Sequence, residues 1–196
     1  MGAYVVSVGA EEWFDEGEDG WGETASALDA ELGRRGLPPY TDVPPEADFV
    51  PGSGQAFEEK LTPSMTGFHA LCGLHLSREE SEVLCGWTVL VPFSLDEEIR
   101  LPIGSGSGSR ESTMVVGAPQ ALPLAQKLAA AIDLPSETPA TCDNLDLSGW
   151  FRHQGKELAA AGAGLWSEDL DTAFYVALFL RAAQHSIRRG CPVVWT

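Results

Sequence analysis

The chain is poor in basic residues. Only 12 of its 196 residues are lysine or arginine, against 29 aspartates and glutamates, so the formal net charge is -17 at pH 7. Because a surface of that sign repels phosphate backbones, we expect no binding to nucleic acid. The same charge attracts a basic partner and also keeps a protein in solution, so it does not by itself separate a binding function from simple solubility.

Long apolar runs and paired cysteine motifs are also missing. No stretch approaches 18 consecutive apolar residues, so the sequence predicts neither a membrane-spanning helix nor a membrane partner. The four cysteines form no CxxC pair, and the first residues lack the basic and apolar regions of a signal peptide. We therefore expect a cytoplasmic protein with reduced thiols and no cofactor.

The remaining composition is that of an ordinary globular protein. Hydrophobic residues make up 44% of the chain, and a chain of this length buries enough surface to fold without disulfides or metal. We expect a single globular domain over residues 1–196, of α+β class, with a mixed, mostly antiparallel sheet of three to five strands packed against helices. The predicted strands are short β-branched or apolar runs: Ala3–Val8, Trp87–Phe93, Ile99–Ile103 and Thr113–Val116.

Helical spacing of apolar residues predicts two helices against this sheet, Leu124–Ile132 and Asp169–Arg189. The second is apolar on nearly all sides from Ala173 to Ala183, so we expect a long buried C-terminal helix. Ser167 is its expected N-cap and Gly190 its expected end.

Two segments have the composition of connections. Residues 37–54 hold five prolines and should form an extended strap anchored by Tyr40 and Phe49. Residues 104–109 alternate glycine and serine and should form a flexible loop. This loop is not a phosphate-binding loop, because no Gly-Lys-Ser/Thr follows it.

An acidic and aromatic segment, residues 11–21, is the best candidate for a partner-binding surface. Aromatic side chains carry much of the energy of protein interfaces, and acidic neighbours select a basic partner. The alternative is that its aromatic residues anchor a solvated loop to the core. The predicted partner-binding residues are Trp13, Phe14, Glu16, Glu18, Asp19 and Trp21.

A cluster of histidine and cysteine is the best candidate for chemistry. The side chains of His69, Cys72 and His75 follow at three-residue spacing, so they share one face of a helix, and Cys85 lies ten residues on. Zinc accepts imidazole and thiolate ligands, and a cysteine with a histidine base can act as a nucleophile. Apolar residues share that face, however, so we expect a packed helix face and no metal.

A third cluster lies on the C-terminal helix. Arg181, His185 and Arg188 line one stripe of it and form a candidate anion-binding site. The alternative is an internal patch of counter-ions for the acidic N-terminal segment that also stabilises the end of the helix.

Two functions follow from these patterns. The first is an acidic, non-enzymatic binding protein of inhibitor, immunity or regulatory type that engages a basic protein partner. The second is a small hydrolase-like enzyme that uses a Cys/His or metal site around residues 69–85.

Overall fold

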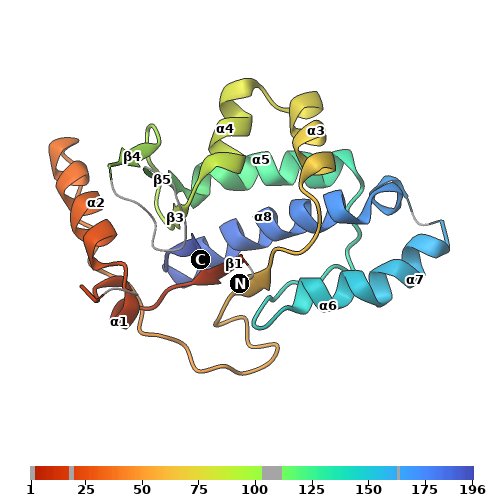
Figure 1. The fold of residues 1–196 in the computed structure, drawn as a ribbon, viewed down its shortest axis with the longest axis horizontal. Coiled ribbons are helices and arrows are strands. Elements are labelled where there is room, and N and C mark those ends of the chain that lie inside the picture. Colours follow the sequence, from red (N-terminus) through yellow and green to blue (C-terminus); the bar gives the residue numbers. More distant parts are fainter. Residues whose placement is uncertain (1–2, 18–19, 103–111, 163) are drawn as a thin grey trace.

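A six-stranded sheet forms the centre of the described part of the chain. The computed structural model describes residues 3–17, 20–102, 112–162 and 164–196 (Figure 1). The strands lie in the order β2-β1-β6-β3-β5-β4. Neighbours are antiparallel except β3 and β5, which are parallel. The bounds are β1 Tyr4–Ser7, β2 Glu58–Lys60, β3 Val89–Val91, β4 Ile99–Leu101, β5 Thr113–Gly117 and β6 Val193–Trp195.

The predicted fold class, α+β with a mixed and mostly antiparallel sheet, is confirmed. Each of the four predicted runs contains a strand, whereas β2 and β6 were not predicted. β2 is a charged edge strand of sequence Glu-Glu-Lys, which lacks the apolar alternation of a typical strand. The glycine–serine segment 104–109 lies outside the described residues.

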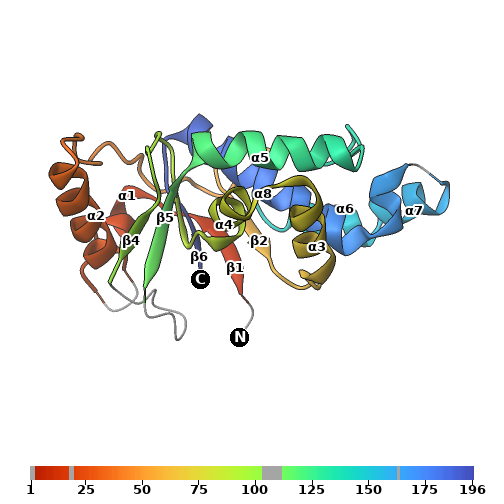
Figure 2. The ribbon, with the colours of Figure 1, turned by 90° about the horizontal axis from the view of Figure 1, so that it is seen from above.

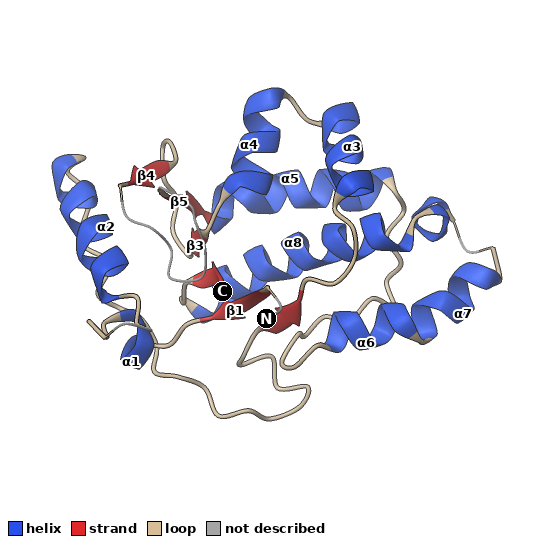
Figure 3. Ribbon diagram, in the orientation of Figure 1, coloured by secondary structure: helices blue, strands red, loops and turns tan. Residues whose placement is uncertain are grey.

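Helices cover both faces of the sheet (Figures 2 and 3). α1 and α2 lie on one side of it, and α3 to α8 lie on the other (Figure 2). Their bounds are α1 Ala10–Trp13, α2 Gly22–Arg34, α3 Thr66–His75, α4 Arg78–Gly86, α5 Ala118–Ala131, α6 Asp146–Arg152, α7 Gln154–Ala160 and α8 Leu170–Arg189. In the described ranges, no helix is both long and apolar enough to cross a membrane.

The long C-terminal helix α8 is buried, as predicted. An unbroken run of its residues, 172–180, is buried on all sides. The Phe179 ring stacks on Phe68 of α3 at 4.9 Å between centroids and meets Trp87 edge-on at 5.7 Å. α8 thereby joins the sheet to the helices around it.

The predicted N-cap of α8 is wrong by two residues. Ser167 lies in a 3-10 turn, Leu165–Glu168, where its hydroxyl donates to the carbonyl of Gly164 at 2.6 Å. Asp169 caps the helix instead, because its carboxylate accepts from the N–H of Thr172 at 3.0 Å. Gly190 ends the helix with a positive φ of 70°, as expected from a C-terminal glycine.

The strap, residues 37–54, contains neither helix nor strand and is anchored by only one of its two predicted aromatic residues. Tyr40 is buried, and its hydroxyl donates to the carbonyl of Gly190 at 2.8 Å. Its ring packs edge-on against Trp13 and Phe93 on the α2 side of the sheet. Phe49 was wrongly predicted as an anchor, because 54% of it is exposed.

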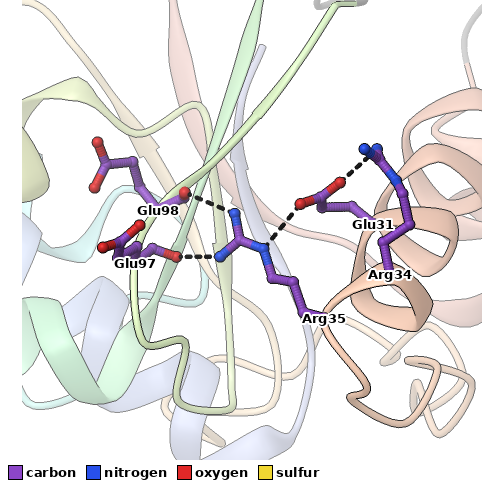
Figure 4. A network of polar contacts seen from close by, with 5 residues as sticks. All are labelled: Glu31, Arg34, Arg35, Glu97 and Glu98. Atoms are coloured by element: carbon purple, nitrogen blue, oxygen red, sulfur yellow. Dashed lines mark hydrogen bonds and ion pairs between the residues drawn. The ribbon is translucent and has the colours of Figure 1, made fainter.

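A polar network ties the end of α2 to the edge of the sheet (Figure 4). Arg35 directly follows α2, and its guanidinium donates to the carbonyls of Glu97 and Glu98, at 3.0 and 3.3 Å, just before β4. Glu31 orients this guanidinium with a 2.9 Å ion pair and also pairs with Arg34. These contacts add a polar attachment to the apolar packing of Leu28 and Leu32, which are buried under α2.

Glu59 of β2 is a carboxyl group buried completely, with an exposed fraction of 0%. Its oxygens accept from the N–H groups of Leu147 and Ser148, at 2.6 and 3.1 Å, and from the Ser148 hydroxyl at 2.9 Å. It therefore caps α6 from a distant strand, since the N-cap residue Leu145 offers no side-chain acceptor. Burial raises the pKa of Glu59 to about 7, although its hydrogen bonds oppose the shift.

The first prediction tests the packing of α8. Replacing Phe179 by Ala should lower the free energy of unfolding by about 3 to 5 kcal/mol, because it leaves a cavity between the two buried rings of Phe68 and Trp87. Leu74→Ala is the control, since Leu74 is 80% exposed, and should change it by less than about 0.5 kcal/mol. Urea denaturation measures both, and equal midpoints for the two variants would contradict the packing.

The second prediction concerns pH. Because the folded-state pKa of Glu59 lies above its ordinary value of 4.5, its stabilisation is complete below pH 4.5 and is lost as the pH rises towards about 7. The difference in unfolding free energy between the wild type and Glu59→Gln should fall by about 3 kcal/mol over that window.

This difference isolates Glu59 from His185, whose folded-state pKa is lowered to about 3 by burial and by Arg188. The contribution of His185 to the free energy of unfolding rises with pH through the same window. Because this contribution is the same in the wild type and in Glu59→Gln, it cancels in their difference. Urea denaturation at several pH values gives the difference. A difference that rises with pH would show instead that the hydrogen bonds hold Glu59 ionised.

Candidate functional site

A cavity of about 350 Å³ lies between the strap, the end of β1 and residues 55–58. The exposed Phe49 forms part of its wall. Five charged side chains line it, of which four are carboxylates: Glu12, Glu46, Glu58, Asp143 and Arg189. It is therefore a concave site with an excess of negative charge.

The strap approaches α1 closely at Gly9, which forms one wall of the cavity. A Cβ atom at Gly9 would lie only 2.5 Å from the Cα of Glu46, so a larger residue would push the strap away. Two hydrogen bonds hold this approach: Ala10 N–H to the carbonyl of Pro44 at 2.9 Å, and Glu46 N–H to the Glu11 carboxylate at 2.8 Å. Glu12 and Glu46 are thus placed by the same contact.

Asp143 holds the opposite wall. Its carboxylate is 2% exposed and accepts from the N–H of Gly54 at 3.0 Å, the N–H of Ala56 at 3.3 Å and the hydroxyl of Ser53 at 3.2 Å. These bonds fix the turn that leads from the strap to β2. Asp143 is therefore a structural member of the wall, whereas Glu12, Glu46 and Glu58 are more exposed.

The pKa of Glu12 is raised by its surroundings at the cavity. Partial desolvation and the nearby charge of Glu46 raise the pKa of Glu12, and a hydrogen bond from the Trp21 side chain opposes the shift. A cation placed between these carboxylates would lower this pKa. The arrangement suits binding of a positively charged group.

The acidic and aromatic segment contributes to this site differently from the prediction. Trp13 is 0% exposed and Trp21 is 7% exposed, so both belong to the core on the α2 side of the sheet. They cannot contact a partner without local opening. Phe14 is 42% exposed and Glu16 is exposed, so both remain accessible, whereas Glu18 and Asp19 lie outside the described residues.

The predicted anion-binding residues contact the chain itself. Arg181 donates to the carbonyls of Pro139 and Thr138, at 2.7 and 3.1 Å, and Arg188 donates to the carbonyl of Gly54 at 3.0 Å. His185 is 2% exposed, and its Nδ1 lies 3.4 Å from the Arg188 guanidinium. Arg181 also donates to the Gln184 side chain at 2.8 Å, so the two arginines are occupied by loop carbonyls and a neighbouring amide, and anion binding at this cluster stays a prediction.

The histidine and cysteine cluster does not converge on one point. His69 and His75 are exposed on α3, whereas Cys72 is 1% exposed and its sulfur contacts that of Cys85 on α4 at 3.6 Å. No group of three or more His, Cys, Asp or Glu side chains in the described ranges is arranged to hold a metal ion. This geometry supports neither the zinc alternative at His69, Cys72 and His75 nor a Cys–His nucleophile.

The cavity under the strap was missed from sequence because its carboxylates come from distant segments. Glu12, Glu46, Glu58 and Asp143 belong to four parts of the chain that meet only in the fold. Gly9 was the available signal, since a glycine between a strand and a helix allows close backbone approach.

The third prediction tests whether Arg181 stabilises the fold or binds an anion. Arg181→Ala should cost about 1.5 to 3 kcal/mol of unfolding free energy, because two loop carbonyls lose a charged donor. Arg152→Ala, at an exposed position on α6, is the control and should change little. Urea denaturation measures the unfolding free energy of both variants. Thermal melting with added sulfate tests anion binding: sulfate that raises the melting temperature of the wild type but not of Arg181→Ala would support an anion-binding site at Arg181.

Comparisons with known proteins do not assign this site to a family. No protein-family model, no curated protein sequence and no solved structure matches the chain.

Proposed function

We propose that this chain is an acidic, non-enzymatic binding protein, of inhibitor, immunity or regulatory type, that engages a basic protein partner. The observation that carries the proposal is the cavity under the strap, whose wall holds four carboxylates against one guanidinium. Its volume of about 350 Å³ lies at the small end of ligand cavities, so it suits one lysine or arginine side chain of a partner.

Charge provides the attraction and the selectivity. The net charge of -17 steers a basic protein towards the surface, and the cavity offers a defined place for one of its cations. Entry of that cation stabilises the ionised form of Glu12, whose pKa is raised by partial desolvation and, to a smaller extent, by the charge of Glu46. The gain is specific to a cation, because an anionic or neutral side chain would leave the pKa of Glu12 raised.

Exposed apolar side chains at the rim provide the lasting contact. Phe49 lines the cavity, and both Phe49 and the adjacent Val50 are 54% exposed. Aromatic residues beside a charged pocket are typical anchors of protein interfaces. Phe49 therefore takes the partner-binding role that the sequence predicted for Trp13 and Trp21.

The hydrolase-like alternative around residues 69–85 has less support. An activated nucleophile needs a base within hydrogen-bonding reach. The Cys72 sulfur contacts a second thiol, that of Cys85, and both His69 and His75 are exposed residues of α3.

The fourth prediction tests whether the cavity carboxylates, and not only the net charge of the protein, direct binding of a basic partner. In the triple variant Glu12→Gln, Glu46→Gln, Glu58→Gln, association with a basic partner should slow about tenfold or more, because both steering and the cation site are weakened. The control triple Glu97→Gln, Glu157→Gln, Glu168→Gln has the same net charge and changes exposed residues outside the cavity lining. Affinity purification identifies the partner, and stopped-flow binding at two salt concentrations gives the rates.

The two triple variants decide the outcome. A slower rate in the cavity triple alone supports the site, whereas equal slowing in both would show that only net charge matters. Phe49→Ala should chiefly speed dissociation, since apolar anchors set the lifetime of a complex. A purification that returns no basic protein would overturn the proposed function.

A further inference from the structure

Two thiols from neighbouring helices meet in the α3–α4 hairpin. The sulfur atoms of Cys72 and Cys85 lie 3.6 Å apart, close enough for one thiol to donate a hydrogen bond to the other. The hairpin is held by the capping box at its turn, where Ser77 and Glu80 exchange hydrogen bonds of 2.7 and 3.1 Å. The two sulfurs therefore face each other in a defined geometry.

Solvent reaches this pair from one side. A cavity of about 450 Å³ lies between the two helices, and both sulfur-bearing residues line it together with His69, Gly73 and Arg78. Cys72 is 1% exposed, whereas Cys85 is half-buried. Cys85 is thus the sulfur that a reagent in the cavity meets, and Cys72 lies behind it.

The charges at this cavity differ from the strongly acidic average of the protein. His69 and Arg78 line it, and the one carboxylate in its lining, Glu82, pairs with Arg100 at 2.6 Å. A small anionic disulfide therefore meets less repulsion here than elsewhere on the surface.

The hydrogen bond between the thiols makes one proton easier to lose and the other harder. The bond from Cys85 lowers the pKa of Cys72, and the same bond, together with burial, raises the pKa of Cys85. Cys85 also lies in the last turn of α4, where the helix dipole disfavours an anion. Cys72 is therefore the resting thiolate and the base of the pair, and the more accessible Cys85 sulfur becomes a nucleophile as it passes its proton to Cys72.

The other two cysteines provide an internal comparison. Cys142 is 2% exposed, and Cys191, which lines the cavity under the strap, is 4% exposed. Burial raises the pKa of Cys142 well above its ordinary value and that of Cys191 to about 11. Both are inert core thiols in the folded chain.

We propose that Cys72 and Cys85 form a dithiol site for thiol–disulfide exchange, whose substrates are small disulfides of the glutathione type. This site is independent of the binding function proposed above. It assigns Cys85 as the entry sulfur and Cys72 as the resolving sulfur.

The exchange proceeds in two balanced steps. The Cys85 proton passes to the Cys72 thiolate, and the Cys85 sulfur attacks one sulfur of the substrate; its S–S bond breaks, and one thiolate leaves with the electron pair. The leaving thiolate takes the proton from Cys72. The Cys72 thiolate then attacks the Cys85 sulfur of the mixed disulfide and releases the second substrate thiolate. That thiolate takes from water the proton that the pair gave to water when its resting thiolate formed. Two electrons pass from the protein to the substrate, which becomes two thiols.

The fifth prediction uses the wild-type chain and glutathione disulfide. We expect two glutathiones released per chain, a mass lower by two hydrogen atoms, and a crosslinked peptide that joins Cys72 to Cys85. The bridge closes a short loop, so the oxidised protein should melt roughly 5 °C or more above the reduced protein. Cys142 and Cys191 should stay free until the chain is denatured.

Single variants assign the order of attack. Cys72→Ser should stop at a mixed disulfide on Cys85 with one glutathione released, and Cys85→Ser should release none. Phenylarsine oxide, which bridges two close thiols, should protect both from alkylation in the wild type and should not protect the one that remains in each variant.

The wild-type result decides the proposal even if a variant fails to fold. A stable mixed disulfide on Cys85 beside a free Cys72 would overturn it. Oxidation of Cys142 or Cys191 ahead of the pair, or no release of glutathione, would overturn it as well.

Discussion

The structure depends on one constraint: a helix that is apolar on nearly all sides must be buried by other elements of the fold. α8 meets this requirement by packing against α5, α3 and α6 and against one face of the sheet (Figures 1 and 2). The aromatic side chains of Phe174, Tyr175 and Phe179 fill the space between these elements. Because the helix occupies one face of the sheet, the opposite face is left to α1, α2 and the strap.

The candidate binding site is a product of that second layer. Proline and tyrosine hold the strap extended and close to the sheet, and Tyr40 joins it to the residue that ends α8. The strap therefore spans a gap instead of filling it, and the cavity remains beneath it. The carboxylates at this cavity are held by backbone contacts at Gly9 and by the buried Asp143, so they are brought together before any partner arrives.

The sequence predicts those features that depend on local chemistry. The β-branched runs became strands, and Gly190 ended the buried helix. It does not predict features made by distant segments. Glu59 reads as one charge in a charged run, yet it caps α6 across the fold, and Trp13 reads as a surface aromatic although the strap covers it. The contact between Cys72 and Cys85 needed the angle between two helices, which spacing alone does not give.

The position of β6 has a consequence for biosynthesis. Val193–Trp195 lies between β1 and β3, so it joins the two halves of the sheet. Until these residues leave the ribosome, β1 with β2 and β3 with β5 and β4 are separate ribbons with open edges. The sheet can therefore close only after Val193–Trp195 has been made, and until then the open edges of β1 and β3 favour aggregation of the nascent chain.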